Sequence, residues 1–149
     1  MRAVVQRVSK AQVNIEGDIS GKIGEGLVVF LGICSQDSET DINWLADKIV
    51  HLRIFNDKNS KMNLSLTDIG GEMLIISQFT LYGDCRKGRR PGFSTAAPPD
   101  LAKPLYEHFI EKVKQMGIKT ATGIFQAEMQ VALINDGPVT LMLDSKKNF

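Results

Sequence analysis

The segment Asn135-Asp136-Gly137-Pro138-Val139-Thr140 constrains the C-terminal third of this chain more than any other stretch. It lies between two apolar runs, MQVALI and VTLML, and Asp-Gly between such runs ordinarily indicates a tight β-hairpin. Proline opposes that turn, because it disfavours helical angles in the preceding residue and has no N–H for the ladder. The segment therefore fits a loose hairpin turn, or a cis Gly-Pro bond that reverses the chain and points two carbonyl oxygens the same way.

Short apolar runs bounded by turn residues fill most of the remaining chain, which predicts strands. Two segments instead have helical spacing: one is capped by Ser38 or Thr40 and ends near His51, and the other opens at Pro98-Pro99 and is stopped by Gly117. We therefore expect one α+β domain over residues 1–149, with two main helices and a mainly antiparallel sheet that curls toward a barrel. The expected strands are 3–8, 11–15, 19–23, 27–33, 53–55, 73–82, 118–122, 129–134 and 139–143, with a polar loop at 56–63 and an irregular segment at 83–99.

Composition and charge fit an ordinary globular protein, with 43% hydrophobic and 23% charged residues. The net charge of +1 means that any affinity for nucleic acid must come from a local patch. The longest apolar run, 27–33, is too short to span a bilayer, and the N-terminus lacks a signal-type apolar segment. A cytoplasmic location is therefore expected, with Cys34 and Cys85 as reduced thiols.

The usual catalytic constellations are missing from the sequence. His51 and His108 both fall on predicted helices, and neither has a partner at metal-ligand spacing. The chain has no phosphate-binding P-loop and no G-x-S-x-G nucleophile elbow. No metal and no nucleotide cofactor is therefore expected.

Two stretches remain unusual. In SQFTLYGD, the polar residues Ser77, Gln78 and Thr80 interrupt an apolar strand, which indicates either a solvated face or a group of donors converging on a carbonyl, as in an oxyanion hole. The following loop holds four positive charges within five residues, which indicates either a solvated loop or a patch that contacts phosphates. These charges belong to Arg86, Lys87, Arg89 and Arg90.

Together these stretches resemble the D-aminoacyl-tRNA deacylase family. SQFTLYGD and NDGPVT are similar to its two signature motifs, and MRAVVQRVSKAQV and GIFQAEMQV are similar to other parts of it. The resemblance implies a cytoplasmic homodimer, without a metal or other cofactor and without a membrane. Its partner would be the acceptor end of aminoacyl-tRNA, from which it would hydrolyse the ester of a D-amino acid, or of mischarged glycine.

The resemblance also implies a role for the Gly-Pro motif. Gly137 and Pro138 would form a cis peptide that reaches from one subunit into the active site of the other, held in place by Arg7. Its carbonyl oxygens would accept the substrate's α-ammonium, and the same wall would leave no room for a side chain in the L configuration.

The remaining roles are assigned by position. Ser77, Gln78 and Phe79 would line the ester, with the N–H groups of Gln78 and Phe79 as candidates to stabilise the oxyanion. Thr80 is a nucleophile by residue type, but attack by water assisted by the ribose 2′-hydroxyl is preferred, because no histidine is placed to activate Thr80. Phe125 and Met129 would either form a pocket for the terminal adenosine or be simple core residues. The phosphates of the acceptor stem would be contacted by Arg86, Lys87, Arg89 and Arg90.

Three rival interpretations stay open. The chain could be a non-catalytic nucleic-acid-binding protein that uses the same basic loop. It could be a related deacylase with a trans Gly-Pro and weaker rejection of L substrates, although Arg7 and the intact NDGPVT argue against this. A generic esterase is disfavoured, because no catalytic triad can be assembled from the sequence motifs.

Overall fold

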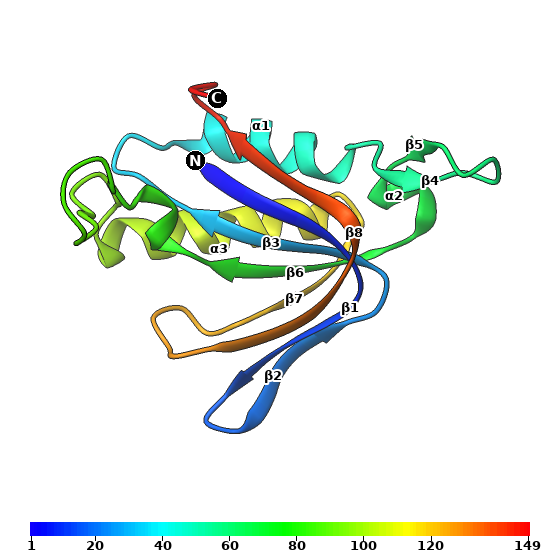
Figure 1. Cartoon of the computed structure of the whole chain (residues 1–149), viewed down its shortest axis with the longest axis horizontal. Helices are drawn as coiled ribbons and strands as arrows, with labels where there is room; N and C mark the ends of the chain where they lie inside the picture. Colours follow the sequence, from blue (N-terminus) through cyan, green and yellow to red (C-terminus); the bar gives the residue numbers. More distant parts are fainter.

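Strand β1 (Arg2–Ile15) is the element around which the sheet is built in the computed structural model, which describes all residues from Met1 to Phe149. On one side it pairs with β8 (Gln130–Asp144) along nearly its whole length. On the other side its first half pairs with β3 (Gly26–Gly32) and its second half with β2 (Asp18–Ile23). All three pairings are antiparallel, and Figure 1 shows β1 and β8 curving together through the molecule.

The remaining strands make the sheet mixed. β6 (Glu72–Ser77) runs parallel to β3, and β7 (Lys119–Thr122) runs parallel to β6. Helix α1 (Glu39–Val50) lies in the first of these two connections, and α3 (Pro99–Gln115) makes the second. A helix between two strands is the usual route to parallel pairing, so the expectation of a mainly antiparallel sheet was imprecise, whereas the α+β class is confirmed.

The sheet is nearly closed into a barrel, as the sequence predicted, because β7 returns to β2. A β-carbon on Gly21 would lie 2.7 Å from the Thr122 carbonyl oxygen, so this close approach requires a residue without a side chain. The Ser20 hydroxyl also reaches that oxygen, at 3.5 Å.

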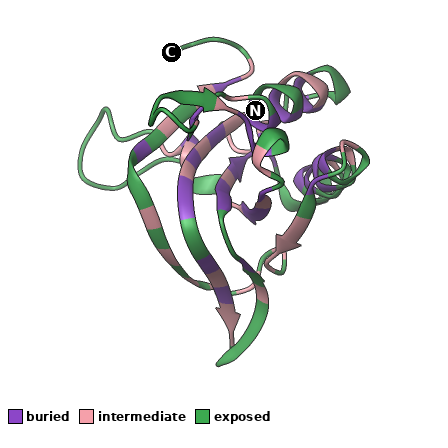
Figure 2. Ribbon diagram, turned by 90° about the vertical axis from the view of Figure 1, so that its right-hand side faces the viewer, coloured by how far each residue is buried: buried purple, intermediate pink, exposed green.

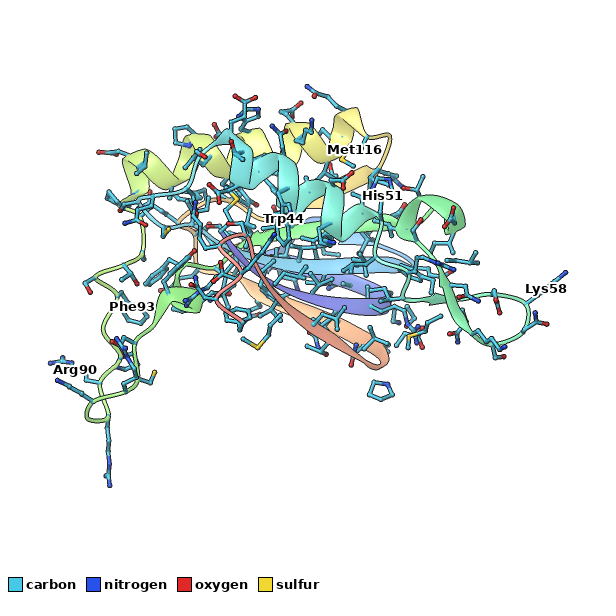
Figure 3. All side chains as sticks on the ribbon, turned by 90° about the horizontal axis from the view of Figure 1, so that it is seen from above. Trp44, His51, Lys58, Arg90, Phe93 and Met116 are labelled. Atoms are coloured by element: carbon cyan, nitrogen blue, oxygen red, sulfur yellow. The ribbon has the colours of Figure 1, made fainter.

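Two apolar layers enclose β3 and β6, whose residues are buried on both faces. One face, with Val29 and Ile75, packs under α1 and α3, which lie side by side over the sheet (Figures 1 and 3). The other face, with Val28 and Leu74, fills the inside of the curled sheet. In Figure 2 buried residues alternate with half-buried and exposed ones along the long strands, as expected for a sheet with two different faces.

The helix boundaries follow the signals in the sequence. The Asp41 carboxylate accepts hydrogen bonds from the N–H and hydroxyl of Ser38 at the start of α1. Pro98 and Pro99 open α3, and Gly117, at φ +84°, follows its end. The expected polar loop at 56–63 is partly wrong, because it contributes to a small hairpin of β4 (Phe55–Asn56) and β5 (Met62–Leu64), followed by the short helix α2 (Leu66–Ile69).

The expected strand 73–82 is too long. β6 ends at Ser77, and a 3₁₀ helix, η1 (Phe79–Tyr82), follows. The Gln78 N–H makes the last bond to the neighbouring strand, donating to the Leu31 carbonyl oxygen at 2.8 Å. Beyond that bond the chain turns away from the sheet, which places the polar part of SQFTLYGD at its edge.

Of the two alternatives for Asn135–Thr140, the hairpin turn is wrong. β8 continues through the segment as one strand, just as the expected strands 3–8 and 11–15 form the single strand β1. The pairing jumps from Val8↔Asn135 to Gln6↔Thr140, so the four residues 136–139 stand opposite Arg7 alone. The segment is therefore a bulge in a continuing strand, and the Gly137-Pro138 peptide within it is cis.

Candidate active site

A cavity of about 670 Å³ lies where β3 and β6 end. Ligands of sheets with parallel strands commonly bind beyond the carboxyl ends of those strands, and this volume is in the usual range for a small-molecule site. Three segments far apart in the sequence form its walls: the end of β6 with η1, the segment leading into α3, and the loop between β7 and β8. Its lining contains no Asp, Glu, His, Cys, Lys or Arg.

Three residues of the SQFT segment, Ser77, Gln78 and Phe79, line one wall of the cavity. Ser77 and Gln78 are half-buried there, whereas Thr80 is exposed and lies outside the lining. The Gln78 side-chain amide donates a hydrogen bond to the Thr80 hydroxyl oxygen. Because the Gln78 backbone N–H is already bonded to Leu31, the amide of Phe79, first residue of the 3₁₀ helix, is the remaining backbone candidate for an oxyanion.

Phe125 and Met129 form the opposite, apolar wall. Both side chains are half-buried and line the cavity, so they contribute to the core and to the site together. Phe125 is backed by Tyr106, with ring centroids 5.8 Å apart, and the Tyr106 hydroxyl donates to the Ile75 carbonyl oxygen at 2.8 Å. Met129 lies against Gly123, where any β-carbon would collide with its sulfur. The Phe125 ring offers an aromatic surface on which a base could stack.

Phe93 is a site residue that sequence reasoning missed. Its ring lies edge-to-face on Phe79, with centroids 5.1 Å apart, and it lines the same cavity. The contact joins the 3₁₀ helix η1 to the irregular segment after it, and the only signal in the sequence is a phenylalanine three residues after Arg90.

The basic run lies on a loop that projects beside the cavity. Asp84 and Gly92 close the base of this loop by two backbone hydrogen bonds, of 2.7 and 3.0 Å. Figure 3 shows Arg90 toward its outer end and Phe93 nearer the body of the protein. Arg86 is paired with the Asp84 carboxylate, and this guanidinium lowers the pKa of that carboxyl. Lys87, Arg89 and Arg90 are exposed and have no carboxylate partner.

The Gly137-Pro138 bulge does not reach the cavity of its own chain. Arg7, opposite the bulge, pairs with Leu27 at the start of β3, whereas the cavity begins beyond the Leu31↔Ser77 pair at its end. Along β3, Leu27 and Leu31 are four residues apart, so about 13 Å of strand separates the bulge from the start of the cavity. Gly137 and Pro138 are both exposed, so this peptide is presented to the outside of the molecule.

Neither histidine lies in the cavity lining. His51 follows α1 and contacts Asp47, and His108 is exposed on α3. No three His, Cys, Asp or Glu side chains lie close enough together to hold a metal ion. None of the helices is both long and apolar enough to cross a membrane.

The fold and the site thus define a small α+β protein whose ligand pocket lies at the end of parallel strands. A family model described as D-Tyr-tRNA(Tyr) deacylase matches residues 4–144. D-aminoacyl-tRNA deacylases of Thermosipho africanus and Clostridioides difficile are 62% and 59% identical to the chain, over all of both sequences. The chain therefore belongs to the D-Tyr-tRNA(Tyr) deacylase family.

Two solved structures share this fold. The c-Myc DNA Unwinding Element Binding Protein has a TM-score of 0.91 and 38% identity, covering 97% of this chain and 98% of that one. A probable eukaryotic D-amino acid tRNA deacylase has a TM-score of 0.81 and 20% identity, covering 95% and 97%. At that identity, the second likeness concerns the fold alone.

Proposed function

We propose that this protein hydrolyses the ester that joins a D-amino acid, or glycine, to the terminal adenosine of tRNA. Family membership and the names of its relatives support this activity. The observation that carries it in this chain is that one cavity is lined both by Ser77, Gln78 and Phe79 and by Phe125 and Met129. That arrangement offers a polar side for an aminoacyl ester and an apolar side for a nucleoside.

The chemistry proposed is direct attack by water on the ester carbonyl carbon. The bond from that carbon to the ribose oxygen then breaks, which releases the free amino acid and the tRNA hydroxyl. The Phe79 N–H would stabilise the oxyanion, and the Gln78–Thr80 pair would fix the polar wall. Because the lining holds no carboxylate or imidazole, the ribose 2′-hydroxyl would assist the attacking water.

The rest of the substrate would extend away from this centre. Phe125 and Met129 would hold the adenine, since a base can stack on an aromatic ring. Lys87, Arg89 and Arg90, with Arg86, would contact phosphates of the acceptor stem, which lies next to the terminal adenosine. A substrate of this kind is consistent with a protein of the cytoplasm.

Rejection of L-amino acids would require a second copy of the chain. Gly137 and Pro138 are exposed and lie at the opposite end of β3 from their own cavity, so only a partner's motif could complete the site. The sheet face not covered by helices offers the contact surface. Met142 is 64% exposed there and stands in register with the half-buried Val4 and Phe30.

The test is deacylation of D-Tyr-tRNA, L-Tyr-tRNA and Gly-tRNA by the purified protein in the presence of EDTA. Loss of the D-tyrosyl and glycyl esters, with the L-tyrosyl ester preserved, is the expected result. Hydrolysis of both tyrosyl esters would contradict the chirality filter, and hydrolysis of none would contradict the activity.

A second candidate function is DNA binding, suggested by the name of the c-Myc DNA Unwinding Element Binding Protein, which is 38% identical to this chain. The exposed basic loop would be its contact surface. Binding of single-stranded DNA at the salt concentration of the deacylation assay, without any D-ester hydrolysis, would favour this alternative.

A further inference from the structure

Phe93 connects the basic loop, residues 84–92, with the wall of the cavity. We propose that Phe93 is a positioning residue, which couples phosphate binding at the basic loop to the placement of Phe79 at the ester. This inference rests on the proposed function, since it requires a substrate with both an ester and a phosphate backbone.

The contact between the two rings is the first observation. Phe79 and Phe93 meet edge-to-face at 5.1 Å and 66°, a favourable arrangement for an aromatic pair. They nevertheless remain 56% and 38% exposed at the cavity. No other aromatic ring pairs with Phe79, so Phe93 is the aromatic side chain that can hold it in one orientation.

The backbone around Phe93 is held on both sides. The preceding residue, Gly92, is joined to Asp84 by two backbone hydrogen bonds. The carbonyl oxygen of Phe93 itself accepts a hydrogen bond from the Ala96 N–H at 3.1 Å. The ring also packs against the backbone of Gly83, where a β-carbon would be 3.1 Å from its Cε1. Phe93 therefore lies at the junction of the loop, η1 and the cavity, and a shift of the loop base is passed to its ring.

The charges of the loop lie on the far side of that junction. Lys87, Arg89 and Arg90 have no carboxylate partner, and in Figure 3 Arg90 and Phe93 lie along one projecting arm. The hydrogen bonds within this arm are those at its base and the contact of Arg86 with Asp84. Phosphates bound along the arm would fix its orientation, and Phe93 would carry that restriction to Phe79.

The experiment compares two substrates that share the ester but differ in phosphates: D-Tyr-tRNA and 3′-O-(D-tyrosyl)adenosine. Wild-type kcat should be higher on the tRNA. Phe93→Ala should lower kcat on the tRNA about tenfold, to the level of the short substrate, because reacting groups are sensitive to small misplacements. Its KM for the tRNA should stay within about twofold, because the charges that dominate affinity remain. Phe93→Tyr should restore kcat, and Phe149→Ala, which removes another exposed aromatic ring, should leave both substrates unchanged.

A double-mutant cycle tests the coupling itself. Arg89→Gln/Arg90→Gln should lower kcat on the tRNA in the wild-type background, but not in the Phe93→Ala background. If Phe93→Ala does not fold, judged by circular dichroism and thermal unfolding, Phe93→Leu replaces it in the same cycle.

The outcomes separate this inference from the proposed function. An equal fall of kcat on both substrates would overturn it, because Phe93 would then be only part of the cavity wall. A change of KM alone, or additive effects in the cycle, would overturn it as well. Failure of the wild type to hydrolyse D-Tyr-tRNA would overturn the proposed function and this inference together.

Discussion

The Arg7 guanidinium holds the backbone of Asp136, donating from Nε to its carbonyl oxygen at 3.0 Å across 129 positions of sequence. Arg7 is only 7% exposed, and its Nη1 donates to the carbonyl oxygen of Ile54, the residue just before β4. From the other side, the Asn135 amide donates to the carbonyl oxygens of Arg7 and Val139. The Arg7 Nε also lies 3.0 Å from the Asp136 carboxylate, so the exposed Gly-Pro bulge is fixed at both ends by donors to main-chain oxygens and at one end by an ion pair as well.

Replacing Arg7 by lysine should loosen this bulge. Lysine keeps the charge but lacks the fork that reaches Asp136 and Ile54 together. We expect a loss of about 1–3 kcal/mol in the free energy of unfolding, the usual effect of stranding buried polar groups, and a lower ratio of D- to L-ester hydrolysis. Denaturant unfolding and deacylation measure both. Asp136→Asn retains the backbone carbonyl and removes only the ion pair between Arg7 Nε and the exposed Asp136 carboxylate, at 3.0 Å, so it should cost no more than about 1 kcal/mol. An effect as large as that of Arg7→Lys would refute this account.

Gly137→Ala should strongly reduce the D-specific activity without unfolding the chain. The new methyl group would stand on the exposed bulge, 3.0 Å from the Asn135 side-chain oxygen, where a partner's substrate is proposed to lie. We expect about a hundredfold loss in kcat/KM, typical of a reacting group displaced by an ångström. Gly24→Ala is the matched control, because its β-carbon would meet only the Glu72 carboxylate, at 4.0 Å. Equal activities of the two variants would contradict the role of Gly137.

Gly123→Ala tests the adenosine wall. Its methyl group would displace the flexible side chain of Met129, which lines the cavity, without touching the backbone. We expect KM for D-Tyr-tRNA to rise about tenfold, or about 1.4 kcal/mol of binding, while kcat and the melting temperature change little. A fall in kcat with KM unchanged would assign Met129 to the chemistry and not to substrate binding.

Met142→Glu should separate the proposed dimer. A carboxylate on the uncovered sheet face would have to be desolvated in an interface, whereas in the monomer Met142 is 64% exposed and the change is tolerated. Light scattering should show a monomer, and hydrolysis of D-Tyr-tRNA should be lost with it. Leu101→Glu, at a 40% exposed position on α3, should leave both unchanged. A fully active Met142→Glu monomer would contradict the cross-subunit site.

Acid should weaken the fold through Asp41. Burial raises the pKa of this carboxyl, but hydrogen bonds from Lys146, Ser145 and Ser38 outweigh burial and lower it. A depressed folded-state pKa stabilises the protein above the unfolded-state value, near 3.9, and this contribution is lost as the pH falls below that value.

Lys146→Met should remove part of this contribution. Because Lys146 is itself 39% exposed, we expect a loss of about 1 kcal/mol at pH 7, no more than a screened ion pair provides, and a smaller loss at pH 3. Lys58→Met, on an exposed loop at the far end of Figure 3, is the control. Urea unfolding at both pH values measures the difference, and a loss independent of pH would argue against an ionic cause.

The sequence was most informative where local pattern decides structure. Ser38, Pro99 and Gly117 marked helix ends because capping and backbone angles are local properties. At Asn135–Thr140 the pattern allowed a hairpin turn or a cis Gly-Pro bond, and the cis bond is present. The hairpin is absent because the extra residues form a bulge opposite Arg7 and the strand continues. The parallel pairing of β3 with β6, and the contact of Phe93 with Phe79, depend on segments distant in sequence. The residue pattern within a single segment does not indicate which distant segment it will contact.

The pairing of β1 with β8 has a consequence for how the chain folds during synthesis. The two strands share the longest pairing of the sheet, yet more than a hundred residues separate them in the sequence. Closing such a loop is slow, and contacts of this kind raise contact order and lower folding rates. While the ribosome is still translating, β1 has an open edge along its whole length, a template for wrong pairing. The sheet becomes complete only after residue 144 has left the exit tunnel.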